Sequence, residues 1–377
     1  MACYLVTGGA GFIGSNFVHY LLWTYPDAQV VNVDALLHAG MLANIADLAD
    51  DPRHTFVHAD ICDERAMDEL FAKHGPDYVV NFAAQTHVDR GIEDPLAFNR
   101  SNVEGCLTLL QMARRDWEEP DGGYGEHLFV QMSTDEVYGS LPHASAPLWR
   151  EDALLAPRNP YSASKASAEL YTMAYADTYG LPVNIVRSSN CYGPFQFPEK
   201  LIPLTIARAL RHADVPLYGD GLNLRDWVYV ADLCQALDLV LRKGRPHQVY
   251  NIGARSQRRN AELVGELLGE LARQTGDSSI DDTLVSYVAD RKGHDRAYGV
   301  DPSKAEAELG WRPRTALHEG LAKTVAWYLA NPQWVESALS RDYLQENERL
   351  LRAWGQAGED PQAPKRTKGR HALLRRR

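Results

Sequence analysis

Short apolar runs alternate with helix-like spacings along the first 210 residues of the chain. Runs rich in Val, Ile, Leu and Phe predict β-strands near residues 3–7, 29–33, 54–58, 78–82, 127–132 and 183–187. Between them, apolar residues spaced three or four apart predict helices near 12–24, 63–73, 97–116, 161–179 and 201–211. This alternation is typical of a parallel sheet covered by helices on both faces. We therefore predict an α/β fold with a doubly wound parallel sheet of the Rossmann type.

The composition of the sequence changes after about residue 188, where Pro, Gly and Arg become more frequent. We predict a nucleotide-binding domain over 1–187, a smaller substrate-binding domain over 188–335 that closes over the cleft, and a C-terminal extension over 336–377. The first two parts can interleave along the chain. The extension ends in a basic tail, 365–377, with seven Lys or Arg and no acid. We expect a solvated, disordered tail, and a docking or nucleic-acid arm is the alternative.

A glycine-rich turn, TGGAGFIG, follows the first predicted strand and precedes the first predicted helix. This is the setting that a dinucleotide fingerprint requires. Gly8 and Gly11 allow the backbone to approach a pyrophosphate closely, and Gly14 lets the helix pack on the strand. The start of the helix, with Phe12 and Ile13, then faces the phosphates. The turn predicts a bound dinucleotide.

The ends of the other predicted strands supply further candidates for the cofactor site. Asp34 ends the second strand, twenty residues after Gly14, where a carboxylate can bind ribose hydroxyls and disfavours a 2′-phosphate. The sequence therefore predicts NAD rather than NADP. In a parallel sheet the carboxyl ends of the strands face the ligand. The remaining strand-end candidates are Asp60, Ile61, Ala83, Ala84, Ser133 and Asn190.

A Ser-Thr-Asp-Glu cluster and a Tyr-x-x-x-Lys pair lie close together between residues 133 and 165. Tyr161 and Lys165 are four residues apart, so on a helix they share one face. An ammonium about 4 Å from a phenol, at an effective dielectric of about 20, supplies roughly the 4 kcal/mol that a phenol needs to act as a base at neutral pH. Burial acts in the opposite direction, and a positive nicotinamide ring would help. The pair predicts a catalytic base; an exposed helix carrying Tyr and Lys is the alternative.

Composition narrows the class of protein. The chain has 377 residues, 45% of them hydrophobic, which is enough for a sizeable core, and its net charge of -11 argues against a general nucleic-acid surface. No apolar run approaches the roughly 20 residues that span a bilayer, and the chain starts at the first strand without a leader, so we expect a cytoplasmic protein. The five cysteines lack a CxxC pair or metal-like spacing. They predict reduced thiols and no metal site.

Nine motifs, in order along the chain, resemble the nucleoside-diphosphate-glucose 4,6-dehydratases of the extended short-chain dehydrogenase/reductase superfamily. The resemblance runs from about residue 2 to about residue 347. The Thr-Asp-Glu triplet, FPEKLIP and RKGHDRAY are more specific to the dehydratases than the glycine turn or the Tyr-Lys pair, which mark the superfamily. The motifs are TGGAGFIG, HADICD, NFAAQTHVDR, STDEVYG, YSASK, NCYGPFQFPEKLIP, RDWVYV, YNIG and ADRKGHDRAYGVD.

The resemblance implies a reaction and a set of roles. Tyr161 would remove the proton of the sugar 4-hydroxyl as NAD⁺ takes the C4 hydride; Thr134 would share that hydrogen bond, and Lys165 would hold the phenolate and the nicotinamide ribose. Glu136 would then take the C5 proton. Asp135 would protonate the C6 hydroxyl so that it leaves as water, and hydride would return to C6.

Two neighbouring carboxyl groups can share this work only if both point into one site. Adjacent side chains on a strand point to opposite faces. We therefore expect the backbone at Asp135 and Glu136 to have left the strand for a turn or the first residues of a helix. An acidic pair that complements a helix N-terminus is the alternative. Unequal burial of the two groups would separate their pKa values.

The resemblance also implies the substrate, a nucleotide sugar, and the residues that bind it. Arg225 and Arg291 match pyrophosphate-binding arginines, whose guanidinium groups suit phosphate oxygens. Asn102 would lie on the cofactor or sugar side, and the family's dimers imply a homodimer formed through the helices near 97–116 and 161–179. The other implied substrate residues are Thr86, His87, Thr134, Asn190, Glu199, Lys200, Leu201, Tyr218, Asn260, His294 and Tyr298.

One difference from the family's motif leaves the base and the hexose of the substrate undecided. Many bacterial members of this family have Glu-Ser-His where this chain has Gln85, Thr86 and His87, a form more similar to plant UDP-glucose 4,6-dehydratases. Either dTDP-glucose or UDP-glucose therefore fits. Within the superfamily, a nucleotide-sugar 4-epimerase, which needs no Asp-Glu pair, and a UDP-glucuronate decarboxylase are alternatives. Outside enzymes, the alternative is an NAD-sensing regulatory protein, which would be expected to have lost the Tyr or the Lys.

Overall fold

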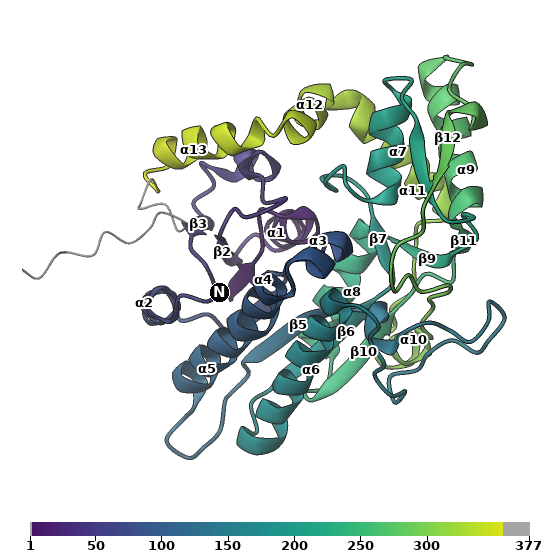
Figure 1. Ribbon diagram of the computed structural model, residues 1–377. Coiled ribbons are helices and arrows are strands. Elements are labelled where there is room, and N and C mark those ends of the chain that lie inside the picture. The colour runs from purple at the N-terminus through teal and green to yellow at the C-terminus, as the bar shows by residue number, and fades with distance from the viewer. Residues whose placement is uncertain (1, 357–377) are drawn as a thin grey trace, which may run out of the picture.

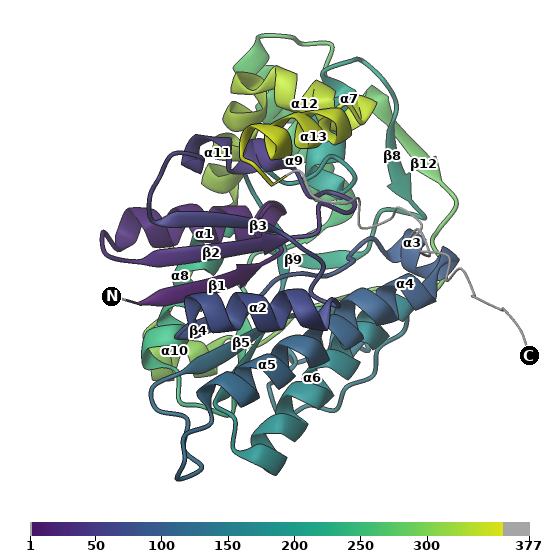
Figure 2. The same ribbon diagram turned by 90° about the vertical axis from the view of Figure 1, so that its left-hand side faces the viewer.

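The computed structural model describes residues 2–356, and its centre is a seven-stranded parallel sheet (Figures 1 and 2). The strand order is β10-β6-β5-β4-β1-β2-β3. The predicted doubly wound sheet is confirmed, and all six predicted strands belong to it. The chain reverses its direction of winding between β1 and β4, which is where an open parallel sheet binds its ligand. The strands are β1 Cys3–Thr7, β2 Gln29–Asp34, β3 His54–His58, β4 Tyr78–Asn81, β5 Leu128–Thr134, β6 Val183–Ser188 and β10 Gln248–Ile252.

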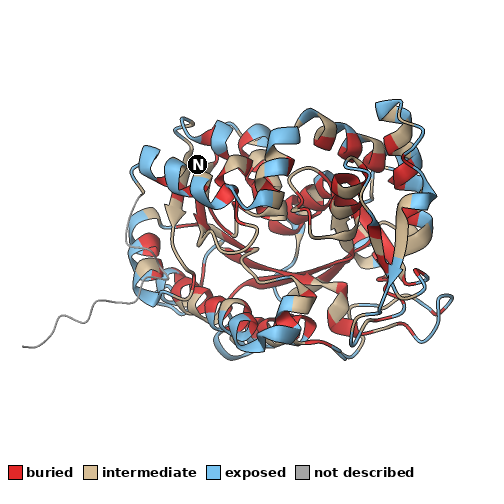
Figure 3. Ribbon diagram, turned by 45° about the horizontal axis from the view of Figure 1, so that its top comes forward, coloured by how far each residue is buried: buried red, intermediate tan, exposed pale blue. Residues whose placement is uncertain are grey.

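Helices cover both faces of this sheet and leave most of its strands buried (Figure 3). One face packs against α2, α5 and α6, and the other against α1, α8 and α10. The helix predicted over 97–116 is not continuous: α4 passes through a π-helical turn at 100–104 before α5 begins. The helices are α1 Phe12–Thr24, α2 Glu64–His74, α4 Pro95–Asn99, α5 Gly105–Trp117, α6 Pro160–Tyr179, α8 Val230–Lys243 and α10 Ser303–Leu309.

A second lobe stands over the carboxyl ends of the strands and has its own apolar core. It contains a three-stranded sheet of order β11-β9-β7, a two-stranded parallel pair of β8 and β12, and the helices α7, α9 and α11. Of these elements the sequence predicted only α7. They are β7 Asn190–Tyr192, α7 Leu201–Ala209, β8 Val215–Tyr218, β9 Leu224–Tyr229, β11 Gln257–Arg259, α9 Asn260–Thr275, β12 Val285–Val288 and α11 Leu317–Ala330.

The division into two lobes does not follow the order of the chain. β10, α8 and α10 come from beyond residue 188, yet they complete the large sheet and cover one of its faces. The last two helices, α12 Pro332–Ser340 and α13 Tyr343–Ala353, run back over the first part of the chain (Figure 1). No helix within 2–356 is long and apolar enough to cross a membrane. The basic tail, 365–377, lies outside the described residues.

Candidate functional site

A cavity of about 220 Å³ lies at the carboxyl ends of β1, β2 and β4. The glycine turn between β1 and α1 forms its floor. Gly8 has φ +69°, and a Cβ there would lie 2.7 Å from the backbone nitrogen of Ala83, so only glycine fits this close approach. A Cβ on Gly14 would collide with the carbonyl of Gly8. The predicted cofactor residues in the wall are Gly8, Gly11, Phe12, Ile13, Gly14, Asp34, Asp60, Ile61, Ala83 and Ala84.

Asp34 stands at the end of β2 and ties two backbone segments of this cavity together. Its Oδ2 accepts from the backbone N–H of Ala10 at 3.0 Å, and its Oδ1 accepts from that of Leu36 at 2.8 Å. Burial raises the pKa of Asp34, and the backbone donors oppose that shift. The tight turn, the start of α1 and this carboxylate fit the pyrophosphate and ribose of a dinucleotide.

A second cavity, of about 340 Å³, adjoins the first, and six residues line both. The shared residues are Phe12, Ile13, Thr86, Gln196, Glu199 and Lys200. The second cavity lies between the large sheet and the second lobe. All the substrate residues expected from the sequence line it: Thr86, His87, Thr134, Asn190, Glu199, Lys200, Leu201, Tyr218, Arg225, Asn260, Arg291, His294 and Tyr298.

The carboxyl pair stands in the wall of this second cavity. β5 ends at Thr134, and the next four residues form a 3-10 turn whose N–H at Glu136 donates to the Thr134 hydroxyl at 3.2 Å. The turn expected at this point is therefore present. It allows Asp135 and Glu136 to line one cavity, which consecutive strand residues could not do.

The two carboxyl groups differ in burial and partners. Asp135 is 2% exposed; its Oδ1 accepts from the Thr134 hydroxyl at 3.3 Å, and its Oδ2 has no hydrogen-bond partner among residues 2–356. Burial, and then the charge of Glu136, raise the pKa of Asp135 well above its usual value. Glu136 is less buried and accepts from the amide of Asn159 at 3.2 Å. Asp135 is thus disposed to keep its proton, and Glu136 is the more accessible carboxyl group of the pair.

Tyr161 faces the carboxyl pair from the first turn of α6. Asn159 caps this helix in a capping box with Ser162. The Tyr161 ring is 9% exposed and packs against Val88 and Phe98. Burial and the charge of Glu136 raise the pKa of Tyr161. Burial, which was expected to oppose the phenolate, is the largest cause of this shift, and the Lys165 ammonium is not among its causes.

Lys165 and Asn102 lie behind the two cavities and line neither of them. The Lys165 ammonium donates to the carbonyl of Met132 at 2.7 Å, and burial lowers its pKa to about 8. Asn102 exchanges two hydrogen bonds with the backbone of Gln85, at 2.7 and 3.0 Å, and donates to Ser164 at 2.8 Å. Asn102 therefore fixes the strand-end segment beside the cofactor cavity.

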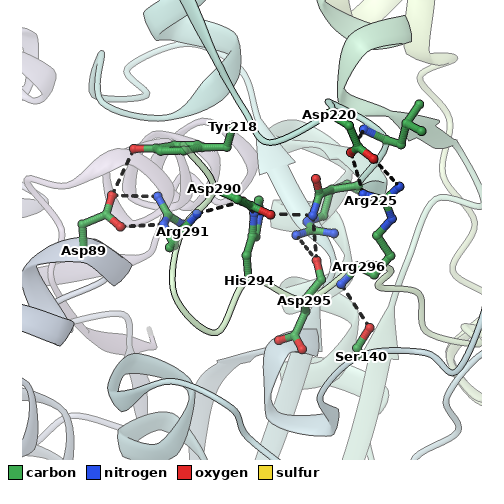
Figure 4. Close-up of polar contacts among 12 residues, drawn as sticks. Asp89, Ser140, Tyr218, Asp220, Arg225, Asp290, Arg291, His294, Asp295 and Arg296 are labelled. Atoms are coloured by element: carbon green, nitrogen blue, oxygen red, sulfur yellow. Dashed lines mark hydrogen bonds and ion pairs between the residues drawn. The ribbon is translucent and has the colours of Figure 1, made fainter. Parts of the chain in front are cut away.

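Arg291 lies at one end of the second cavity in a network drawn in Figure 4. Its Nε is 2.6 Å from Oδ1 of Asp89, and its Nη2 donates to Oδ2 at 2.8 Å. The Tyr218 ring lies 5.0 Å from the guanidinium, and the Tyr218 hydroxyl donates to the same carboxylate at 3.4 Å. Burial acts to lower the pKa of Arg291, but the ion pair with Asp89 outweighs it and raises it. Arg291 is thus held charged at the cavity edge.

Arg225 is the second cation of this region and is 6% exposed. It donates to the carbonyl of Asp295 at 2.8 Å (Figure 4). Its guanidinium stacks 4.2 Å from the centre of the Tyr298 ring. Nδ1 of His294 is 2.6 Å from Oδ1 of Asp290. Burial lowers the pKa of His294 and outweighs the opposite effect of the Asp290 carboxylate. Two fixed guanidinium groups and a ring of aromatic and polar side chains can hold a diphosphate.

A third group of side chains, His38, Glu199 and His87, stands where the two cavities meet. Nε2 of His38 is 2.5 Å from Oε2 of Glu199, and Nε2 of His87 is 3.8 Å from the same oxygen. Burial acts to raise the pKa of Glu199, but His38 and Lys200 outweigh it and lower it. The Lys200 ammonium donates to the carbonyl of Thr86 at 2.8 Å.

Several residues of the site were not found from the sequence. His38, Asp89 and Asn159 have partners distant in the chain, and Trp227 lines the second cavity; only their positions beside predicted residues could have pointed to them. Unpartnered buried atoms also gather in the second cavity. Within 2–356 they include Ser133 Oγ, Asp135 Oδ2, Asn190 Oδ1, Trp227 Nε1 and Asn260 Oδ1. Buried polar atoms normally have partners, so this cavity is built for a polar ligand.

A Rossmann sheet with a dinucleotide cavity, joined to a Thr-Tyr-Lys set and a second cavity under a C-terminal lobe, defines an extended short-chain dehydrogenase/reductase. The comparisons specify the family. A family model described as GDP-mannose 4,6 dehydratase matches residues 5–324. The dTDP-glucose 4,6-dehydratase of Shigella flexneri is 45% identical, over 90% of this chain and 96% of that protein. The corresponding enzyme of Xanthomonas campestris pv. campestris (strain B100) is 46% identical, over 91% and 97%.

Solved structures agree with this assignment. The dTDP-glucose 4,6-dehydratase of Streptomyces venezuelae, with NAD and the dTDP ligand TYD bound, is 45% identical with a TM-score of 0.81, over 89% of this chain and 99% of that one. A UDP-glucose 4-epimerase of Thermotoga maritima is 33% identical with a TM-score of 0.76, over 88% and 99%. The chain belongs to the nucleotide-sugar 4,6-dehydratase family, which the GDP-mannose 4,6 dehydratase model describes.

Proposed function

We propose that this chain is an NAD-dependent dehydratase that converts dTDP-glucose to dTDP-4-keto-6-deoxyglucose and water. The observation that carries the proposal is the carboxyl pair: a buried Asp135 with a raised pKa stands beside a more accessible Glu136, and both line the cavity that Tyr161 lines. An elimination needs an acid and a base at neighbouring carbons, and unequal environments provide both. The identity of 43–46% to dTDP-glucose 4,6-dehydratases supports the same reaction.

The residues of the chain divide the work between them. NAD⁺, when bound, would supply the hydride chemistry at C4 and C6 and a positive charge that favours the Tyr161 phenolate. Tyr161 takes the proton of the 4-hydroxyl, and the hydroxyl of Thr134 orients it. Lys165 lies outside the cavity lining and donates a hydrogen bond to the carbonyl of Met132, on the strand that ends at Thr134. The C4 ketone acidifies C5, so Glu136 can remove the C5 proton while Asp135 gives its proton to the departing C6 hydroxyl.

The nucleotide diphosphate is held at the other end of the cavity. Arg225 and Arg291 bind its phosphate oxygens, and Asn190, Asn260 and His294 supply further polar contacts. Tyr218, which is 37% exposed, is the aromatic surface for the base. Asp34 and the glycine turn bind the adenosine half of NAD.

Product analysis by mass spectrometry across a panel of nucleotide hexoses tests the reaction and the base preference together. We expect loss of water from dTDP-glucose and a product that absorbs at alkaline pH. UDP-glucose belongs in the panel because Gln85 and Thr86 match the UDP-glucose form of the motif. A galactose epimer formed without loss of water would instead identify a 4-epimerase and refute the proposal.

Association into a homodimer is part of this proposal. On α6, Leu170 is 63% exposed, Tyr171 45% and Tyr179 43%, an apolar surface of the kind that partner helices cover. The mass measured by light scattering tests it, and a monomer at assay concentration would refute it. All five cysteines are free thiols. They suit a reducing compartment, and on that basis we propose the cytoplasm.

A further inference from the structure

The loop that follows β2 forms one wall of the cofactor cavity. Five of its residues line that cavity: Ala35, Leu37, His38, Ala39 and Gly40. Its backbone is strained at two non-glycine positions, because Leu36 has φ +50° and Ala39 has φ +65°. Such conformations persist only where the surrounding structure imposes them. A restraint on this loop must therefore come from elsewhere in the fold.

Helix α13 supplies that restraint through Asn347. This residue is 5% exposed, and both halves of its amide are used on the loop. Its Nδ2 donates to the carbonyl of Gly40 at 2.8 Å, and its Oδ1 accepts from the N–H of Leu42 at 2.8 Å. The partners are more than 300 residues apart in the chain. Both bonds lie at the end of the strained segment.

Helix α12 holds the next residues of the same segment. The indole N–H of Trp334 donates to Oδ1 of Asn44 at 2.8 Å, and Met41 packs against Ala338 and Tyr343. Figure 2 shows both helices lying over this part of the chain. The two C-terminal helices thus hold residues 40–44 from one side.

The held segment in turn contacts the glycine turn. The N–H of Met41 donates to the carbonyl of Ala10 at 3.0 Å, and Nδ2 of Asn44 donates to the same oxygen at 2.9 Å. Ala10 is also the residue whose N–H binds Asp34. A continuous path of hydrogen bonds therefore leads from α12 and α13 to the turn that faces the pyrophosphate.

We propose that α12 and α13 form a clamp that retains NAD by fixing residues 35–44, with Asn347 as the positioning residue. The inference rests on the proposed NAD site, and it assigns a role to a region beyond residue 324, where the family match ends. The clamp holds a wall of the cofactor cavity, and no residue of α12 or α13 lines the substrate cavity, which the loop meets through the contact of His38 with Glu199. Its loss should weaken NAD binding without changing the affinity for the nucleotide sugar.

The test uses the full chain with Asn347→Ala and the matched control Glu348→Ala, whose side chain is 71% exposed on the same helix. NAD release is followed by the NAD content of the purified protein and by the rate of exchange with labelled NAD. We expect release about tenfold faster in Asn347→Ala, equivalent to about 1.4 kcal/mol. The control and the KM for nucleotide sugar at saturating NAD should be unchanged.

A second variant tests the clamp independently, in case Asn347→Ala does not fold. Trp334→Phe keeps an aromatic side chain, smaller than indole, and removes the N–H that binds Asn44, so we expect faster release from a chain with the wild-type circular dichroism spectrum. Wild-type release rates in folded Asn347→Ala and Trp334→Phe would overturn the clamp. Failure of the wild-type chain itself to bind NAD would instead refute the proposed function, so the two failures are distinguishable.

Discussion

Replacing Asp135 with Asn removes the proton proposed to leave with the C6 hydroxyl and keeps the size of the side chain. Asp135 is 2% exposed, and its Oδ2 has no partner within 2–356, so the amide enters the same space without breaking a described contact at that atom. General acid catalysis contributes about 10²–10⁴ in rate. We expect kcat for dehydration of dTDP-glucose to fall by about 10³, with KM nearly unchanged.

The C4 oxidation should survive this change because it uses Tyr161. Stopped-flow absorbance should then show reduced coenzyme that forms at the normal rate and persists, while no 4-keto-6-deoxy product appears. Asp152→Asn, an exposed carboxyl in the following loop, is the matched control. Near-normal dehydration by Asp135→Asn would refute the assignment of the acid.

The pH dependence of kcat and of the free energy of unfolding provides a second test of Asp135→Asn. Because the pKa of Asp135 is raised, the proton is present at low pH and lost as the pH rises through the folded value, so wild-type kcat should fall on the alkaline side. Between the unfolded pKa of about 3.9 and the raised value, the folded chain binds the extra proton. The free energy of unfolding therefore falls by about 1.4 kcal/mol for each pH unit of rise in that window. Asp135→Asn should lack both the alkaline limb and this contribution, and a variant that kept them would contradict the assignment.

Four further changes test other parts of the site and fold. Glu136→Gln should form reduced coenzyme yet lose about 10²–10⁴ in release of water, and normal water release would show that another group is the base. Tyr161→Phe should abolish the coenzyme signal itself; a wild-type transient in rapid-mixing absorbance would exclude Tyr161 as the first base. Trp227→Phe keeps an aromatic side chain, smaller than indole, and removes a buried N–H. KM for the nucleotide sugar should therefore rise about fivefold at constant kcat, in line with about 1 kcal/mol for one hydrogen bond; an unchanged KM would show that the substrate does not use this N–H. Glu169→Gln leaves Arg187, 2.6 Å away and 6% exposed, without its counter-charge, so denaturant titration should show a loss of about 3–5 kcal/mol, and a loss under about 1 kcal/mol would contradict the buried ion pair.

Local features of the sequence predicted much of the fold and the site. The glycine turn between β1 and α1 depends on residues within one short segment, and its geometry follows from missing side chains. The turn at Asp135 followed from strand alternation together with the roles that the resemblance implies for Asp135 and Glu136. Five of the six predicted strands, β1, β2, β4, β5 and β6, are mostly buried and rich in apolar residues, which is why they were recognisable; β3, at the edge of the sheet, has one buried residue.

Features set by distant contacts were not predictable in this way. The His38–Glu199 pair joins residues 161 apart, and neither side chain carries a local signal of the other. The strands β8, β9, β11 and β12 are three to six residues long and mix Arg, Gln and Pro with apolar residues, so periodicity gives little evidence for them. The pKa shift of Tyr161 depends on burial of its ring, which packs against Val88 of α3 (Val88–Glu93) and Phe98 of α4, both more than 60 residues earlier in the chain.

The position of β10 has a consequence for synthesis of the chain. This strand, Gln248–Ile252, pairs with β6 and forms one edge of the large sheet. A ribosome must therefore release about two-thirds of the polypeptide before the large sheet can acquire its last member, and until then β6 presents an unpaired edge to other nascent chains. A chain truncated near residue 187 would lack β10, so its β6 edge would stay unpaired and prone to aggregation.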